Sequence, residues 1–131
     1  MKGRETQELR GFVGAVLTGG RSRRMGRDKA LVPVKEIPMS LRVANSMFEA
    51  GARDVYAVGG DSESLSALGL RYVADESPHE GPLGGIISAL RASSEEVVVV
   101  TACDMPWIRA EHVSRLVVAL GPNEVAMSAA D

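Results

Sequence analysis

A loop rich in glycine and positive charge follows the first apolar run of the chain. The run is Phe12–Leu17, and the loop opens with Thr18-Gly19-Gly20. Between Arg21 and Lys29 there are five cations and one acid. Glycines let a ligand approach the backbone closely, and cations neutralise phosphate groups. We therefore interpret this loop as a phosphate-binding site.

The loop differs from the two best-known phosphate-binding motifs. Gly26 is followed by Arg27-Asp28 where a P-loop has Lys-Ser or Lys-Thr, and the Gly-x-Gly-x-x-Gly spacing of dinucleotide-binding loops is absent. A solvated basic loop is the alternative interpretation. The position directly after a strand favours phosphate, because ligands of doubly wound sheets bind at the carboxyl ends of the strands.

A carboxylate stands at the end of the most apolar run of the chain. Residues 97–101 are Val-Val-Val-Val-Thr, and Asp104 follows within the segment Cys103-Asp104-Met105-Pro106. Mg²⁺ takes oxygen ligands and bridges them to substrate phosphates, so Asp104 is a candidate magnesium ligand. The alternative is that Asp104 caps the following turn.

A third polar segment, 75–85, begins with Asp75 and ends with Gly84-Gly85. The two glycines permit close approach of the helix that starts here, and the amino terminus of a helix favours a negative group. Taken without other information, a tight turn leading into a helix is the better explanation of the segment.

We expect the remaining residues with reactive or aromatic side chains to have structural rather than functional roles. His79 and His112 have no partner at the spacing of metal ligands, and we expect both at the surface. Cys103 has no candidate base nearby in the sequence, which predicts a buried and inert thiol. We expect Met105 and Trp107 to pack beneath their loop.

Strands and helices alternate along the chain, and the order predicts an α/β fold built on a doubly wound, mostly parallel sheet. The run at 97–101 has no polar alternation, which indicates burial on both faces. One helix is predicted to have an apolar face formed by Leu83, Ile86, Ile87 and Leu90. The predicted strands are 12–17, 55–58, 71–73, 97–101 and 125–127, and the predicted helices are 39–50, 62–68, one beginning near Leu83 and one with Val113, Leu116, Val117 and Leu120 on one face.

Length and composition limit the class of protein. The chain has 131 residues, 45% of them hydrophobic and 24% charged, as expected for one globular domain. We place this domain at 11–131 and treat residues 1–10 as a disordered lead-in, since they lack the apolar stretch of a secretory signal. A net charge of -2 argues against binding to nucleic acid or anionic membrane. The single cysteine and the absence of a long apolar run favour a cytoplasmic protein.

In combination, these motifs resemble the molybdenum cofactor guanylyltransferase family over residues 11–120. The resemblance is carried by four segments and implies a Rossmann-like nucleotidyltransferase that transfers GMP from GTP to molybdopterin and releases pyrophosphate. It further implies GTP and molybdopterin as partners, together with proteins that mature molybdoenzymes. The segments are Leu17-Thr18-Gly19-Gly20, Arg24-Met25-Gly26 with Asp28-Lys29, Gly81-Pro82-Leu83-Gly84-Gly85 and Cys103-Asp104-Met105-Pro106.

The resemblance also assigns roles to individual residues. It implies that Leu17, Gly19 and Gly20, with Thr18 between them, contact the guanine nucleotide, and that Asp75 lies near it. It implies that Asp104 binds both nucleotide and Mg²⁺. Lys29, Arg24 and, as a weaker candidate, Arg21 would hold the phosphates of the leaving group.

The chain departs from the family pattern in two places. Relatives often have an asparagine just after the second strand, where this chain has Val58-Gly59-Gly60. The further strands and the acceptor-binding segment of family members have no counterpart here, so we expect the C-terminal strands to be missing. Two alternatives stay open: a cytidylyl or sugar-phosphate nucleotidyltransferase, and a truncated nucleotide-binding fragment without catalysis.

Overall fold

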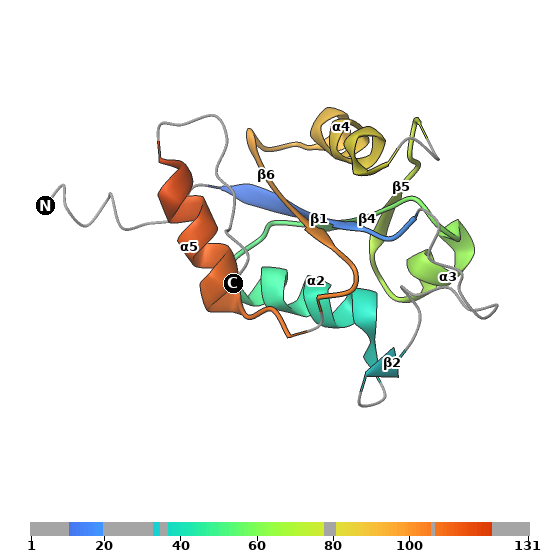
Figure 1. Ribbon diagram of the computed structural model, residues 1–131, viewed down its shortest axis with the longest axis horizontal. Coiled ribbons are helices and arrows are strands. Elements are labelled where there is room, and N and C mark those ends of the chain that lie inside the picture. Colours follow the sequence, from blue (N-terminus) through green and yellow to red (C-terminus); the bar gives the residue numbers. More distant parts are fainter. Residues whose placement is uncertain (1–10, 20–32, 35–36, 78–80, 106, 122–131) are drawn as a thin grey trace, which may run out of the picture.

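The structure is a computed structural model that describes residues 11–19, 33–34, 37–77, 81–105 and 107–121. Strands and helices alternate in it as the sequence predicts, with the addition of a two-stranded ribbon formed by β2 and β3 (Figure 1). The elements are β1 (Phe12–Leu17), β2 (Pro33–Val34), β3 (Ile37–Pro38), α2 (Met39–Glu49), β4 (Val55–Val58), α3 (Ser62–Ala67), β5 (Arg71–Val73), α4 (Pro82–Ala92), β6 (Val97–Ala102) and α5 (Ala110–Leu120).

The main sheet is parallel and has the strand order β5-β4-β1-β6. β1 lies between β4 and β6, with Leu17 opposite both Val58 and Ala102. The chain therefore passes from β1 outward to β4 and β5, and then returns to the other side of β1 to form β6. This reversal confirms the predicted doubly wound sheet. It also creates a switch point between β1 and β6, where ligands of such sheets bind.

Helices cover both faces of the sheet, as Figure 1 shows, with α4 on one face and α2 and α5 on the other. The larger core lies on the α2 side and includes Phe12, Val16, Met47 and Val113, all at most 1% exposed. The smaller core lies beneath α4 and is formed by Val13, Ala15, Tyr56, Val58 and Ala89. β1 and β4 contribute to both cores, so packing on both faces positions their carboxyl ends.

The apolar positions predicted for α4 do not form its buried face. Leu83, Ile87 and Leu90 are 63%, 39% and 54% exposed. The residues that face the sheet are small, namely Gly84, Gly85, Ser88 and Ala89. The reason is distance: a Cβ added to Gly85 would lie only 2.9 Å from Leu17 Cδ2. The helix approaches the sheet too closely for large side chains.

The expected burial of the strand 97–101 on both faces is correct for one face only. Val97 and Val99 are buried in the larger core, whereas Val98 and Val100 are partly buried and Ala102 is exposed. The buried residues of α4 pack on β1 and β4, which leaves the same face of β6 less covered.

In the part of the chain that the structure describes, no helix has the length and apolar character needed to span a membrane. The predictions for residues 1–10 and 125–127 fall outside the described residues.

Candidate functional site

Three strand ends meet at the carboxyl edge of the sheet. Gly19 follows β1, Gly59 follows β4 and Asp75 follows β5. A Cβ added to Gly59 would lie 3.1 Å from Gly19 Cα and 3.4 Å from Asp75 Cβ. These three residues are therefore immediate neighbours, in the order of their strands. A side chain at either glycine would force the strand ends apart.

Thr18 fixes the glycines after β4. Its side chain is fully buried, and its hydroxyl group donates a hydrogen bond of 2.7 Å to the carbonyl oxygen of Gly59. The N–H groups of Thr18 and Gly19 both donate to the carbonyl oxygen of Val58, at 3.0 and 3.1 Å. Thr18 was predicted to contact the nucleotide, but its hydroxyl group is buried and bonded to the protein backbone. Its side chain therefore holds the backbone after β4 in place.

Only glycine fits after β4. Gly59 and Gly60 have φ values of 80° and 94°, which other residues rarely adopt. A Cβ on Gly60 would also lie 2.8 Å from the carbonyl oxygen of Thr18. At the position where the resemblance leads one to expect an asparagine, the chain therefore presents glycine backbone.

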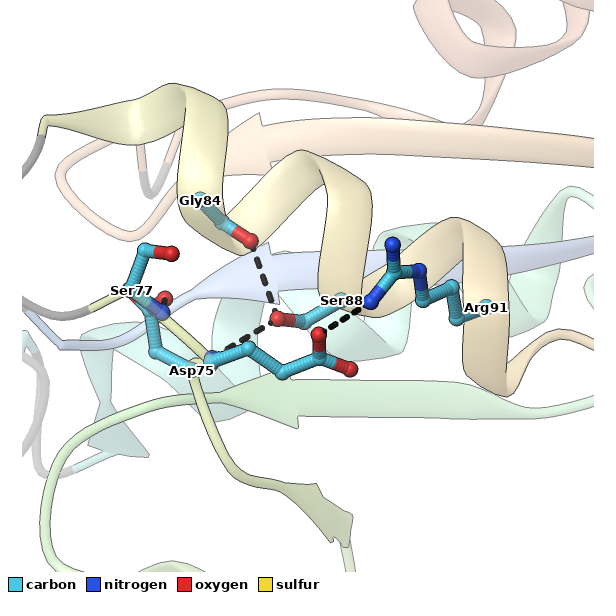
Figure 2. Close-up of polar contacts among 6 residues, drawn as sticks. Asp75, Ser77, Gly84, Ser88 and Arg91 are labelled. Carbon is cyan, nitrogen blue, oxygen red and sulfur yellow. Dashed lines mark hydrogen bonds and ion pairs between the residues drawn. The ribbon is translucent and has the colours of Figure 1, made fainter.

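The Asp75 carboxylate lies against the first turn of α4 (Figure 2). Its Oδ1 accepts a hydrogen bond of 2.9 Å from the N–H of Ser77 and would be 2.9 Å from a Cβ on Gly84. Oδ2 and Leu17 Cδ2 both lie within 4 Å of the position that a Cβ on Gly85 would occupy. The residue before the helix, Gly81, supplies no side-chain cap. The partial positive charge of the helix terminus therefore favours the nearby carboxylate.

Asp104 lies at the same carboxyl edge of the sheet, after β6 and so on the other side of β1 from Asp75. Its side chain is exposed in the turn that follows β6. Ser46 on α2 ties this segment down, since its hydroxyl group donates a 2.6 Å hydrogen bond to the carbonyl oxygen of Ile108. The order β5-β4-β1-β6 separates the ends of β5 and β6 by three strand spacings, about 14 Å. Asp75 and Asp104 thus flank the glycines after β1 and β4 from opposite sides.

The donor groups of this edge suit a metal ion that arrives with a substrate. Within the described residues there is no group of three or more His, Cys, Asp or Glu side chains that would enclose a metal ion. Mg²⁺ does not need such a group, because it is commonly held by one or two carboxylates together with substrate phosphates and water. The single exposed carboxylate of Asp104 fits that requirement.

Several expectations for individual residues are settled by the structure. Cys103 is buried and His112 is exposed, as predicted, and His112 Nδ1 accepts the N–H of Arg109 at the start of α5. The expected packing of Trp107 beneath its loop is wrong, since this side chain is 68% exposed. Cys103 and Ile108 fill the core at this place instead. Met105 is partly buried.

Other predicted residues cannot be placed. Gly20, Arg21, Arg24, Lys29 and His79 lie outside the described residues.

Sequence reasoning missed two buried hydroxyl groups near this edge. Ser88 is 2% exposed and links α4 to the segment after β5. It belongs to the small face of α4, and the spacing of Gly84, Gly85 and Ser88 was the signal for it. Thr101 is 8% exposed, and its Oγ1 has no hydrogen-bond partner among the described residues.

Away from the site, the pKa of Arg71 at the start of β5 is raised by a hydrogen bond to Asp54 and by the charge of that carboxylate.

Fold and site together define a class. A parallel sheet covered on both faces, with glycine backbone and two carboxylates at its carboxyl edge, is typical of doubly wound nucleotide-binding domains. The comparison with known families is more specific. Residues 14–131 match the family described as the MobA-like NTP transferase domain, and the chain belongs to this family.

Curated relatives agree with this assignment. A probable molybdenum cofactor guanylyltransferase of Pelotomaculum thermopropionicum is 46% identical over 96 residues, which cover 73% of this chain and 46% of the relative. A molybdenum cofactor guanylyltransferase of Xanthomonas euvesicatoria pv. vesicatoria is 37% identical over 116 residues, covering 88% of this chain and 57% of the relative. The chain spans about half the length of the curated relatives it matches.

Solved structures show the same fold. Molybdopterin-guanine dinucleotide biosynthesis protein A from Archaeoglobus fulgidus aligns with a TM-score of 0.58 and 26% identity, covering 79% of this chain and 52% of that protein. A CMP:2-keto-3-deoxy-manno-octonic acid synthetase complexed with CTP aligns with a TM-score of 0.74 over 86% of this chain and 48% of that one. At 19% identity, the second likeness concerns the fold alone.

Proposed function

We propose that this chain provides the nucleotide-binding part of a molybdenum cofactor guanylyltransferase, an enzyme that transfers GMP from GTP to molybdopterin. The relatives that bear this name support the proposal. The observation that carries it is the meeting of Gly19, Gly59 and Asp75 at the carboxyl edge, beside the amino terminus of α4. This arrangement offers close backbone approach and a fixed carboxylate at the carboxyl ends of the strands, the edge at which doubly wound sheets bind their ligands.

In this proposal the backbone recognises much of the nucleotide. Leu17, Gly19 and Gly20 contact the guanine nucleotide, and Asp75 lies beside it. Gly59 and Gly60, whose positive φ values turn the chain away from β4, replace the asparagine of other family members by backbone groups. The rigid packing of Gly19 against Gly59 keeps these groups in place without a ligand, so little ordering is needed on binding.

The chemical step needs positioning and charge neutralisation, with no protein nucleophile. An oxygen of the terminal phosphate of molybdopterin forms a bond to the α-phosphorus of GTP, while the bond from that phosphorus to the bridging oxygen breaks and pyrophosphate leaves. We assign Lys29 and Arg24, with Arg21 as a further candidate, to the charge of the leaving group. These residues follow β1 in the sequence, and the carboxyl end of β1 lies at the same edge of the sheet as Asp75 and Asp104.

Asp104 would hold Mg²⁺ together with phosphate oxygens of the nucleotide. The bound ion would neutralise the negative charge that develops on the phosphates. We place the reaction in the cytoplasm, in line with the single cysteine of the chain. The expected partners include proteins that mature molybdoenzymes.

Calorimetric titration of the chain with GTP, CTP and ATP, each with and without Mg²⁺, tests the proposal. We expect GTP to bind most tightly and Mg²⁺ to strengthen its binding. Equal affinity for the three nucleotides would refute the guanine assignment, and a preference for CTP would point to a cytidylyltransferase.

The metal role is tested by Asp104→Asn, with Glu96→Gln as its control. The two carboxylates flank the same strand, Asp104 beyond its carboxyl end and Glu96 just before its amino end. Asparagine keeps the shape of Asp104 and removes the charge that attracts a hard cation. We expect GTP still to bind Asp104→Asn but with most of the Mg²⁺ effect lost, and Glu96→Gln to behave like the parent. An unchanged Mg²⁺ effect in folded Asp104→Asn would show that Asp104 is only a turn residue, since asparagine serves equally well there.

A further inference from the structure

We infer that Ser88, on the buried face of α4, is a positioning residue that holds the Asp75 carboxylate in the nucleotide site. The inference rests on the proposed function, because it takes Asp75 to be a nucleotide contact. It adds a residue that touches neither nucleotide nor metal and acts through its neighbours.

The Ser88 hydroxyl group joins α4 to the segment that follows β5. It accepts a hydrogen bond of 2.9 Å from the N–H of Glu76 and donates one of 2.9 Å to the carbonyl oxygen of Gly84 (Figure 2). The side chain is 2% exposed, so water does not compete for these bonds. The single hydroxyl proton is used by Gly84, which leaves the oxygen lone pairs for Glu76.

This contact fixes the direction in which Asp75 leaves the backbone. The N–H of Glu76 belongs to the planar peptide that begins at the Asp75 carbonyl group, so pinning it fixes the orientation of that peptide. On the side-chain end, Asp75 Oδ1 accepts the N–H of Ser77. The carboxylate is therefore held from both ends of a short segment, 75–77, that packs against Gly84.

The second tie between the same elements is too exposed to do this alone. Arg91 on α4 forms an ion pair with Glu76, and the two side chains are 69% and 49% exposed. Exposed pairs of this kind add little to stability, since water and salt screen them. The buried hydroxyl group of Ser88 is the contact that determines where the segment 75–77 lies.

Ser88→Ala removes the hydroxyl group and nothing else, and Ser93→Ala is a matched control. Ser93 follows the other end of α4, and its hydroxyl group also accepts a backbone N–H, that of Glu95 at 2.9 Å, and donates to a backbone carbonyl, that of Glu95 at 2.7 Å. It lies next to the amino end of β6, away from the site. Both variants lose a serine tie to the backbone, and only Ser88→Ala loses the one to the Asp75 segment.

The first measurement needs no nucleotide. Hydrogen exchange of the ligand-free chain, followed by mass spectrometry, should show faster exchange in peptides that contain Glu76 and Ser77 in Ser88→Ala. Ser93→Ala should exchange there at the parent rate. Unchanged exchange of these peptides in Ser88→Ala would overturn the inference, whatever the nucleotide proves to be.

The second measurement is nucleotide affinity. We expect Ser88→Ala to bind GTP about three- to tenfold more weakly than the parent, the range for one lost hydrogen bond. Ser93→Ala should stay within about twofold on the same scale. Thermal melts of all variants check that each is folded at the temperature of titration.

A double variant separates positioning from a general loss of stability. If Ser88 acts through Asp75, adding Ser88→Ala to Asp75→Asn should weaken GTP binding no further. A full additional loss in the double variant, or parent-like binding by Ser88→Ala, would overturn the inference. Failure of the proposed function would appear differently, in the parent chain itself, as a preference for another nucleotide. The variants would then be compared with that nucleotide.

Discussion

Adding one methyl group to the first turn of α4 should have different consequences at two adjacent glycines. At Gly84 the new Cβ would lie 2.8 Å from the carbonyl oxygen of Ser77 and 2.9 Å from Asp75 Oδ1. At Gly85 its nearest neighbour would be Leu17 Cδ2, also at 2.9 Å, and the next would be Val58 Cγ1 at 3.6 Å. The tip of a leucine side chain can rotate away, whereas the Ser77 carbonyl oxygen moves only with its backbone. Gly84→Ala therefore displaces the segment 75–77, and Gly85→Ala leaves it in place.

The expected magnitudes follow from two opposing effects. Replacing glycine by alanine inside a helix stabilises it by up to about 1 kcal/mol. Inserting a methyl group where the surroundings must shift costs about 1 to 3 kcal/mol. Gly85→Ala should thus range from neutral to about 1 kcal/mol more stable, because only its helix effect remains. Gly84→Ala should be less stable than Gly85→Ala by about 1 to 3 kcal/mol, or roughly 3 to 15 °C in Tm for a chain of this length.

Thermal melts followed by circular dichroism give the Tm of each variant, and calorimetry gives its affinity for GTP. We expect Gly84→Ala to melt lower and to bind GTP more weakly, since Asp75 moves with Ser77. Gly85→Ala should bind GTP nearly as the parent does. Equal Tm values for the two variants, or a higher Tm for Gly84→Ala, would refute the packing described for this turn.

Two further predictions concern a cation of the loop and a pair of buried threonines. Lys29→Ala should weaken GTP binding by about 1.5 to 3 kcal/mol and GMP binding much less, because its ammonium group is assigned to the β and γ phosphates; equal losses in parallel titrations would contradict that role. Thr18→Val should lower the free energy of unfolding by about 1 kcal/mol, since it deprives a buried carbonyl group of its donor, whereas Thr101→Val should raise it by removing a buried hydroxyl group that lacks a partner among the described residues. Urea denaturation checks both signs.

The parallel sheet could be predicted because its strands carry their signal locally. β1 and β6 are short apolar runs, β6 is rich in β-branched residues, and the glycines at 19–20 and 59–60 follow two of the strands as turn residues. Even the short helix α3 was predicted at 62–68 and is found at Ser62–Ala67. The ribbon of β2 and β3 was missed, since two residues per strand show no periodicity and prolines at both ends argue against a strand.

In contrast, a pattern of apolar residues does not determine how closely two elements pack. The helical spacing of Leu83, Ile87 and Leu90 predicted an apolar face correctly but did not tell whether that face meets the sheet. The close approach of α4 selects Gly84, Gly85 and Ser88 for that position, and only the structure shows how close the helix lies. For the same reason the sequence did not predict that Ser88, an uncharged residue inside a helix, belongs to the site.

The topology explains why the proposed site uses two carboxylates that are far apart in the sequence. β1 lies in the interior of the sheet, with β4 and β5 on one side and β6 on the other, so Asp75 and Asp104 would reach a nucleotide bound at this edge from opposite directions. Asp75 is held by Ser77 and lies beside a helix terminus, whereas Asp104 is exposed in a turn. A fixed carboxylate suits recognition of a nucleotide, and an exposed one suits a cation that keeps part of its water. Loss of Asp75 should therefore lower GTP affinity at every Mg²⁺ concentration, while loss of Asp104 should change only the response to Mg²⁺.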